Sequence, residues 1–354
     1  MFQNILKAYN LSDSGYHIEP LGSGLINKTW KVFGNGGQAF VLQRINTDVF
    51  KNPEYIASNI RKIGQYLATV DPLYLFAAPL PASNGRYMVY IEGSYYRLSA
   101  FVPGSQTFDS LTGTGYAYEA AKQFGRFSRL LVSFDIKQLQ YPLPDFHNLN
   151  LRMTQLSNAI RQSEPARLIT AKAQIEKVDA LKSIADTYCD IADKKKIPLR
   201  VIHHDAKINN VLFDKSGKGL CVIDLDTVMP GYFISDVGDM MRTYLAESNE
   251  EQTDMDKITI RPEFFAVIYA GYMGEMGDIL TQAEKELFIY SGKFMIYMQA
   301  VRFLTDYLNG NIYYTTYHKN QNLVRTTNQL KLLEKYLDSE KAFTAIVNKD
   351  GICL

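Results

Sequence analysis

The sequence has few of the features that mark secreted, membrane-spanning and nucleic-acid-binding proteins. Its 354 residues include three cysteines, far apart and without CxxC spacing, which argues against a disulfide framework or a zinc site. Lys and Arg number 38 against 37 Asp and Glu, so there is no electrostatic reason to bind nucleic acid or an anionic membrane. The start lacks a signal peptide's charged and apolar regions, and apolar runs such as 264–274 are too short to cross a bilayer. We therefore expect a cytoplasmic protein with a small-molecule partner, monomeric or weakly self-associating.

The residue pattern changes from β-prone runs to helical periodicity near residues 98–104. Residues 1–100 contain short β-prone runs separated by Gly and Asn clusters, with one helical stretch that begins at Asn52-Pro53. Residues 101–354 have mostly helical periodicity. The expected strands are 29–33, 39–45, 87–91 and 95–101, and the expected later helices include 151–163, 166–195, 283–308 and 321–338. This order predicts an α+β, protein-kinase-like two-lobed fold, with a small β-rich N-lobe (1–100) and a larger, mainly helical C-lobe (101–354).

The second part also holds two apolar β-prone runs, 199–203 and 220–225, that end directly in His or Asp. The first continues as His203-His204-Asp205-Ala206-Lys207-Ile208-Asn209-Asn210, which matches the kinase catalytic-loop pattern H-x-D-x-x-x-x-N. The second leads into Asp224. Phosphoryl transfer needs one carboxylate to orient the attacking hydroxyl, and an amide and a second carboxylate to hold magnesium on the phosphates. The pattern thus predicts ATP and Mg²⁺ as cofactors, with Asp205 as base and Asn210 and Asp224 as metal ligands.

Lys207 follows the predicted base by two residues. Its ammonium would stabilise negative charge on the transferring phosphoryl group, so we assign it a catalytic role. Any one of these residues alone is more typical of a turn, a helix cap or a core position. The set in this order, with a strand before each part, favours the catalytic interpretation.

A glycine-rich turn precedes these parts at residues 21–29. Gly22, Gly24 and Asn27 are predicted to lie against the phosphates of ATP, because backbone N–H groups in such a turn point at anions. A GxG between strands is more often an ordinary hairpin, and Asn27 stands where protein kinases have a third glycine. The position of the turn ahead of the other parts favours nucleotide binding.

A kinase also needs a cation on its third strand, and the run 39–45 offers Arg44 or, one residue earlier, the neutral Gln43. Strand alternation puts these two on opposite faces. We predict Arg44, because a charge is required. Glu54 is a candidate ion-pair partner, although the helix dipole also explains a Glu in a first helical turn.

With these residues in view, the chain resembles the aminoglycoside phosphotransferase and choline kinase superfamily, whose members share the protein-kinase fold and phosphorylate small molecules. Within that superfamily it looks most like the N-acetylhexosamine 1-kinases. The resemblance rests on 203–213, 222–231, Asp236-Val237-Gly238-Asp239 with Arg242, 302–308, and Tyr313-Tyr314. It implies that Arg302 reaches the sugar, and it leaves open whether Asp226 assists the metal or supports the loop.

Arg302 also stands out without the resemblance, because its helical neighbours are apolar and its charge needs a partner or a polar cavity. The alternatives are an ion pair with Asp306 and a sugar contact. Tyr313 is a further substrate-binding candidate, since an aromatic ring can stack on a sugar face.

The predicted function is ATP-dependent phosphorylation of the anomeric hydroxyl of N-acetylhexosamines (GlcNAc or GalNAc). One alternative is a kinase of the same fold acting on another sugar, an aminoglycoside, choline or homoserine. A second is an inactive kinase-like binding module, which the complete set of Asp205, Asn210 and Asp224 disfavours.

Overall fold

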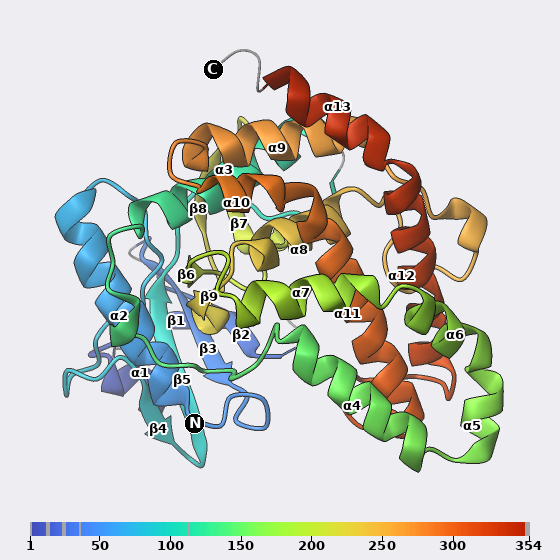
Figure 1. Cartoon of the computed structure of the whole chain (residues 1–354). Coiled ribbons are helices and arrows are strands. Elements are labelled where there is room, and N and C mark those ends of the chain that lie inside the picture. The colour runs from blue at the N-terminus through green and yellow to red at the C-terminus, as the bar shows by residue number, and fades with distance from the viewer. Residues whose placement is uncertain (1, 12–14, 23–25, 35–36, 112, 351–354) are drawn as a thin grey trace. The chain divides into compact units, whose positions relative to one another are not determined.

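The computed structural model describes residues 2–11, 15–22, 26–34, 37–111 and 113–350 (Figure 1). The chain forms two compact units, each assembled from separate stretches of sequence. Unit 1 comprises residues 1–107, 130–144 and 210–230, and unit 2 comprises residues 108–129, 145–209 and 231–354. The chain therefore leaves the first unit after residue 107 and returns to it twice. The division into lobes at residue 100 stays a prediction.

Unit 1 is built on a five-stranded antiparallel sheet with the strand order β1-β2-β3-β5-β4. The strands are β1 (Tyr16–Pro20), β2 (Lys28–Gly34), β3 (Ala39–Ile45), β4 (Val89–Ile91) and β5 (Ser94–Ala100), coloured blue to cyan in Figure 1. Its helices are α1 (Phe2–Ala8) and α2 (Pro53–Val70). All four runs predicted as strands are found, with ends shifted by up to two residues.

The two faces of the sheet differ in chemistry because successive side chains alternate along each strand. Val32, Leu42 and Leu98 are fully buried on one face, in a core that includes Ile5 and Leu6 of α1. The neighbouring positions Gln43 and Arg97, which pair with each other across β3 and β5, therefore belong to the opposite face. The sheet thus has an apolar face against α1 and a face that carries polar groups.

Helix α2 begins at Pro53, as predicted, because proline suits the first helical turn. Asn52 is the residue before it, but its side chain makes no capping hydrogen bond. Its apolar face of Ile56, Ile60, Ile63 and Leu67, which recur at helical spacing, is buried. On the same helix the fully buried Asn59 donates to the carbonyls of Gln140 and Val228, 2.8 and 3.0 Å away, and accepts from the backbone N–H of Gln140 at 2.8 Å.

The last part of unit 1 is a hairpin of β7 (Val211–Phe213) and β8 (Gly219–Val222), followed by the 3₁₀ turn η3 (Leu225–Thr227). The predicted strand 220–225 is thus a strand only as far as Val222, and Leu225 is the first residue of η3. The short turn η2 (Ile208–Asn210) precedes the hairpin, and β9 (Met229–Gly231) follows it. A further 3₁₀ turn, η1 (Ile136–Gln138), lies in the segment 130–144.

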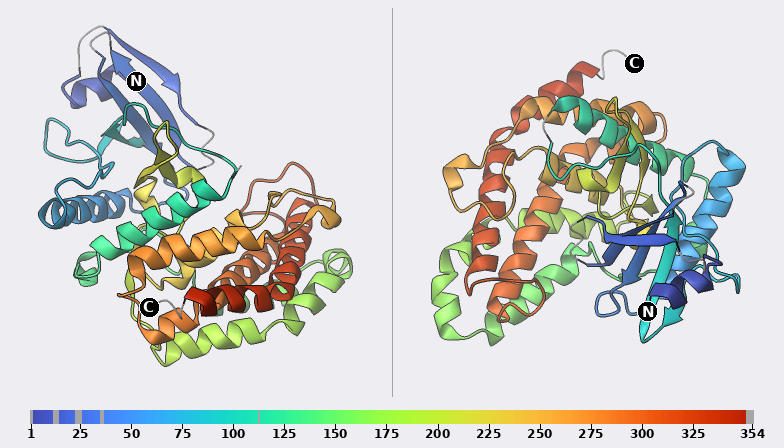
Figure 2. Two further views of the ribbon diagram at one scale, coloured as in Figure 1. Left: turned by 90° about the horizontal axis from the view of Figure 1, so that it is seen from above. Right: turned by 180° about the vertical axis from the view of Figure 1, so that it is seen from behind.

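Unit 2 is mainly helical. Its elements are α3 (Thr114–Leu130, whose last residue belongs to unit 1), α4 (Leu149–Gln162), α5 (Pro165–Thr170), α6 (Lys172–Ala180), α7 (Ser183–Asp193), β6 (Arg200–Ile202), α8 (Ile234–Tyr244), η4 (Met255–Lys257), α9 (Pro262–Met276), α10 (Gln282–Glu286), α11 (Phe288–Leu308), α12 (Gln321–Asp338) and α13 (Glu340–Asp350). Helix α11 is the centre of the unit, since it packs against α4, α8 and α12 (Figure 2). Gly238 allows the close approach of α8, because a Cβ there would lie 2.3 Å from the Ser291 carbonyl.

Two predicted helices are wrong in extent. The expected helix 166–195 is three helices, α5 to α7, and the expected helix 283–308 is divided at Leu287 into α10 and α11. No Gly or Pro lies at these breaks, which fall at Ala171, Leu181-Lys182 and Leu287, and Gly292 lies within α11, so the sequence carries no break signal there. The breaks let short helices follow the surface of α11, which α5, α6 and α7 all contact. In this case tertiary packing overrides local propensity.

None of the helices in the described ranges is long and apolar enough to span a membrane.

Asn59 gives a test of how unit 1 is held together. Asn59→Ala should lower the free energy of unfolding by about 2–4 kcal/mol, because it leaves buried backbone groups of Gln140 and Val228 without partners. Urea denaturation measures the change. Lys62→Ala on the same helix, which removes only an exposed contact with the Gln138 carbonyl, should stay within about 0.5 kcal/mol of wild type. Equal effects of the two substitutions would contradict this account.

Candidate active site

The predicted catalytic loop follows β6 in unit 2, and the carboxylate of Asp236 holds its backbone. The N–H groups of His203 and His204 donate to the two carboxylate oxygens, at 2.8 and 2.7 Å. The Tyr244 hydroxyl, also from α8, donates to the Ala206 carbonyl at 2.9 Å. Helix α8 therefore fixes the loop on both sides of Asp205.

Asp205 and Lys207 form an ion pair in this loop, with Nζ 2.7 Å from a carboxylate oxygen. Both side chains are partly exposed, at 28% and 42%. The attraction of Asp205, helped by that of Asp239, raises the pKa of Lys207. Lys207 is thus protonated beside the candidate base, where a phosphoryl group would need a positive charge.

Close packing fixes the loop in an unusual conformation. His204 has φ of 65°, in the left-handed region that non-glycine residues seldom occupy. Its ring lies against Gly231, where an added Cβ would be 2.5 Å from Nε2. The fully buried ring of His203 packs edge-on against Phe124, at 5.3 Å between centroids. His203 therefore supports the loop from within the core.

The two predicted metal ligands lie at one end of the β7–β8 hairpin in unit 1. Asn210 directly precedes β7, Asp224 follows β8, and Val211 pairs with Val222 between them. The Ile223 N–H donates to the Asn210 carbonyl at 2.9 Å, which closes this end. Asp224 is exposed and has φ of 57°, another left-handed non-glycine residue of the kind that gathers at functional sites.

An amide and a carboxylate oxygen are suitable donors for Mg²⁺, which is usually held by one or two carboxylates together with substrate phosphates. The described residues include no cluster of three or more His, Cys, Asp or Glu side chains that could hold a metal by themselves. Asn210 and Asp224 would therefore bind the ion jointly with the phosphates of a nucleotide.

In the glycine-rich turn, Gly22 has φ of 73°, which favours glycine, and Gly24 lies outside the described residues. Asn27 is almost buried, at 9% exposure. Its amide Nδ2 donates to Asp226 at 2.6 Å, and its Oδ1 accepts from the Asn46 N–H at 2.9 Å. Asn27 thus ties the end of the turn to the segment that follows Asp224.

The polar face of the sheet carries a row of side chains that includes Gln43 rather than Arg44. Gln43 donates to Thr29 Oγ1 at 3.3 Å and accepts from Arg97 Nε at 2.9 Å. Arg97 forms an ion pair with Asp226, in which both side chains are at least 96% buried. Arg44 lies on the other face, with Leu42. The assignment of the nucleotide's cation to Arg44 stays a prediction.

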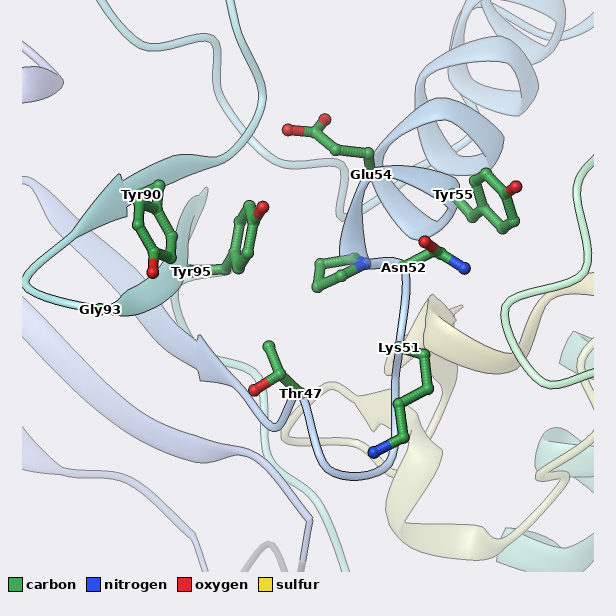
Figure 3. Close-up of a pocket in the computed structure, with 9 residues that line it drawn as sticks. Thr47, Lys51, Asn52, Glu54, Tyr55, Tyr90, Gly93 and Tyr95 are labelled. Atoms are coloured by element: carbon green, nitrogen blue, oxygen red, sulfur yellow. The ribbon is translucent and has the colours of Figure 1, made fainter.

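Glu54, the candidate partner for that cation, is exposed. It lines a pocket of about 330 Å³ at the start of α2, together with residues such as Lys51, Tyr90 and Tyr95 (Figure 3). The pocket includes no other residue that the sequence predicts for the site.

Arg302 lies among aromatic rings in unit 2. Its guanidinium carbon is 5.2 Å from the ring centroid of Phe146, 5.6 Å from that of Tyr314 and 5.9 Å from that of Tyr313. Its NH1 donates to Gln299 Oε1 at 3.2 Å, and Gln299 donates to the Tyr314 hydroxyl at 3.3 Å. Arg302 and Tyr313, predicted separately, are thus close together.

Asp306 has other partners. It accepts from the N–H groups of Ile312, Tyr313 and Tyr314, at 2.9, 2.8 and 3.0 Å, and from Asn322 Nδ2 at 2.8 Å. The ion pair that the sequence left open for Arg302 is not among the salt bridges of the described chain. Asp306 instead fixes the loop that presents the two tyrosines.

Packed rings connect this aromatic group with the catalytic loop. Phe146 stacks on His147, at 4.4 Å between centroids, and His147 lies 5.3 Å from His204. Burial, and then the charges of His204, Arg302 and Arg152, lower the pKa of His147 well below its ordinary value. The rings of Phe146, His147 and His204 therefore extend from Arg302 to the residue directly before Asp205.

Sequence reasoning did not find Arg97, Phe146 or Gln299. Arg97 lies in a run that reads as an ordinary strand, and its polar environment follows only from the register of β5 against β3. Phe146 is far from Arg302 along the chain. For Gln299 the signal was available, since it lies three residues before Arg302 on the same helix.

Comparison with known proteins places this geometry in a family. The family model described as "Phosphotransferase enzyme family" matches residues 17–258, more than half of the chain. The match includes the glycine-rich turn, the catalytic loop and Asp224.

Solved structures with a kinase-like fold superpose on almost the whole chain. A spectinomycin phosphotransferase in complex with ADP and spectinomycin has a TM-score of 0.61 at 12% identity, covering 96% of this chain and 97% of its own. An amicoumacin kinase in complex with AMP-PNP, Ca²⁺ and its substrate has 0.59 at 15%, covering 95% and 96%. A Plasmodium vivax ethanolamine kinase has 0.58 at 14%, covering 92% and 85%. These similarities confirm the predicted α+β kinase-like fold.

Asp236 predicts a specific pH dependence of stability. Burial raises its pKa from 3.8 to about 6, against the opposing effect of the His203 charge and the two N–H donors. Because the folded pKa is the higher one, the folded chain binds this proton more tightly, and the stabilisation is lost as pH rises from about 4 to 6. The stability difference between wild type and Asp236→Asn should therefore shift in favour of wild type as pH falls.

Urea denaturation of both proteins at about pH 5 and about pH 7.5 measures this shift, because the titrations of groups that do not interact with Asp236 cancel in the difference. A shift in the opposite direction would mean that the N–H donors outweigh burial and that the folded pKa is depressed.

Proposed function

Because this chain belongs to the phosphotransferase enzyme family, we propose that it is an ATP- and Mg²⁺-dependent kinase that phosphorylates the anomeric hydroxyl of an N-acetylhexosamine, GlcNAc or GalNAc. In this proposal it is a phosphotransferase with an alcohol group as acceptor. We propose that it acts in the cytoplasm, as a monomer or a weakly self-associating protein.

The nucleotide part of the proposal is supported by the hairpin end that carries Asn210 and Asp224. Bound there with the phosphates, Mg²⁺ would neutralise charge on the transferring group. The spectinomycin phosphotransferase with ADP and the amicoumacin kinase with AMP-PNP, which share the fold, support a nucleotide as the donor.

The observation that carries the acceptor proposal is the position of Arg302 among Phe146, Tyr313 and Tyr314, with its charge unpaired by Asp306. A sugar presents apolar ring faces and many oxygen atoms, so aromatic rings and a guanidinium suit it. Arg152 supports the arrangement, since its NH2 donates to the carbonyls of Asp145 and Phe146 at 2.8 and 3.0 Å.

The charges around this group disfavour a cationic acceptor. Arg152 and Arg302 lie close enough that Arg302, after burial, helps to lower the pKa of Arg152. Choline and aminoglycosides carry positive charge and would be repelled, because recognition requires complementary potentials. A neutral sugar meets no such penalty.

In the proposed mechanism, Asp205 accepts a hydrogen bond from the anomeric hydroxyl and takes its proton as the oxygen attacks the γ-phosphorus of ATP. Lys207 moves from its ion pair to the phosphoryl oxygens, where charge must be stabilised. Most of the acceleration comes from positioning, because phosphoryl transfer requires little covalent chemistry from the protein. The bond to the γ-phosphorus forms at the sugar oxygen, and ADP leaves.

The direct test is ATP consumption with Mg²⁺ across free hexosamines, N-acetylhexosamines, plain hexoses, choline and an aminoglycoside. We expect turnover with N-acetylhexosamines, and a loss of roughly 10²–10⁴-fold in kcat for Asp205→Asn, which cannot accept the proton. Turnover only with a cationic acceptor would support kinase activity and contradict the proposal that the acceptor is an N-acetylhexosamine. Binding of ATP without turnover on any acceptor would favour an inactive kinase-like module.

Arg302→Ala should raise KM for the sugar by about 10–100-fold and leave KM for ATP unchanged, equivalent to a loss of about 1.4–2.8 kcal/mol in acceptor binding. Steady-state kinetics with each substrate varied in turn measures both constants. Arg167→Ala is a matched control, since Arg167 also lies over a tyrosine ring, 5.0 Å from that of Tyr307, on α5. An equal change in the two sugar KM values would show that Arg302 acts only through packing.

A further inference from the structure

Asp226 and Arg97 form a buried ion pair that joins three segments of unit 1. Arg97 lies on β5, and Asp226 lies in η3, two residues after Asp224. Their side chains are 4% and 3% exposed. A buried charge pair is stable only when further hydrogen bonds satisfy its remaining atoms.

Those further bonds are present on both sides of the pair. Arg97 NH1 binds Asp226 Oδ1, while Arg97 Nε donates to Gln43 on β3 at 2.9 Å. Asp226 Oδ2 accepts from Asn27 Nδ2 at 2.6 Å. The pair therefore links the sheet, the end of the glycine-rich turn and the segment that carries Asp224.

Kinases need a cation from the third strand, held by a carboxylate from the following helix. In this chain the polar face of β3 offers the neutral Gln43. The buried polar residue of helix α2 is Asn59, whose amide is used by backbone groups of Gln140 and Val228. Arg97 and Asp226 provide a cation and a carboxylate from two other elements.

We propose that Arg97 is a positioning residue for the metal site: its ion pair with Asp226, oriented by Gln43 and Asn27, sets the place of Asp224. Asp226 then acts as the counterion of Arg97, and Asp224 is the carboxylate that binds the metal. Arg97, and not Arg44, is the cation on which the nucleotide site depends. This inference rests on the proposed function.

A lysine cannot reproduce the arrangement, because its single ammonium cannot bond Asp226 and Gln43 in the fixed fork geometry of a guanidinium. Arg97→Lys keeps the charge and the counterion. It should therefore fold, and it should disturb only the orientation of the pair. The double substitution Arg97→Met with Asp226→Leu removes both charges and fills similar space, which commonly preserves folding.

The experiment is calorimetric measurement of ADP affinity with and without Mg²⁺, together with the urea unfolding midpoint of each protein. In wild type, Mg²⁺ should strengthen ADP binding. In Arg97→Lys and in the double variant this enhancement should fall by about 10–100-fold, the usual effect of losing a residue that orients a metal ligand. The unfolding midpoint of Arg97→Lys should remain close to that of wild type. Arg86→Met, which removes an exposed arginine from unit 1, is the matched control.

An enhancement within about twofold of wild type in folded Arg97→Lys would overturn the inference, since such a change is far smaller than that expected for a displaced metal ligand. If Arg44→Gln loses the Mg²⁺ enhancement of ADP binding and Arg97→Lys keeps it, the cation of the nucleotide site is Arg44. If the double variant does not fold, Arg97→Lys alone decides. A wild type that binds no ADP with Mg²⁺ would instead count against the proposed function, so the two failures are distinguishable.

Discussion

A carboxylate that is removed from water must be supplied with hydrogen-bond donors or an opposite charge, and three buried aspartates of this chain meet that requirement by fixing segments of the candidate site. Asp226 binds Arg97 and Asn27 in unit 1. In unit 2, Asp236 binds the backbone of the catalytic loop, and Asp306 binds the backbone of the loop that carries Tyr313 and Tyr314. Each of the three positions residues other than itself.

The aspartates to which we assign chemistry are different ones. Asp205 is partly exposed and directly follows the backbone that Asp236 holds, and Asp224 is exposed and lies two residues before the buried Asp226. This division follows from solvation. A reacting carboxylate must remain accessible to metal and substrate, whereas a buried carboxylate whose oxygens face protein donors is closed to solvent and to ligands. Left-handed backbone at His204 and Asp224 fits the same scheme, because strained residues persist only where their surroundings hold them.

Much of the architecture follows from local sequence. Alternation and turn residues predict four of the five strands of the sheet, β2 to β5, and periodicity predicts α2 and α12, because these elements match their own propensities. Strand β1 (Tyr16–Pro20) is not among the predicted strands. The division of 166–195 into α5, α6 and α7 has no local signal, since it depends on the course of α11. Where packing decides the end of a helix, that end cannot be derived from the local sequence, because it depends on the surface against which the helix packs.

The candidate site likewise contains residues that the sequence predicts and residues that it does not. The spacing of His203, Asp205 and Asn210 predicts a catalytic loop, because the roles assigned to these residues lie in one short segment. Arg97 escapes detection, since its partners Gln43 and Asp226 are separated from it by 54 and 129 residues. The partner of Arg302 likewise depends on the loop that brings Tyr313 and Tyr314 to it. Sequence spacing reveals residues that act together within one segment. Residues that are brought together by the register of a sheet or by the course of a loop can be identified only from the three-dimensional structure.

The central claim is that the phosphoryl group is transferred to the anomeric oxygen of a neutral amino sugar. Phosphorus NMR of the reaction with ATP, Mg²⁺ and an N-acetylhexosamine tests it most directly, because the coupling of the product phosphorus to the sugar protons identifies the esterified oxygen. The account predicts one phosphate ester coupled to the anomeric proton, labile in acid, formed in equal amount with ADP. A phosphate ester at any other hydroxyl, or ADP formed only with inorganic phosphate, would contradict it.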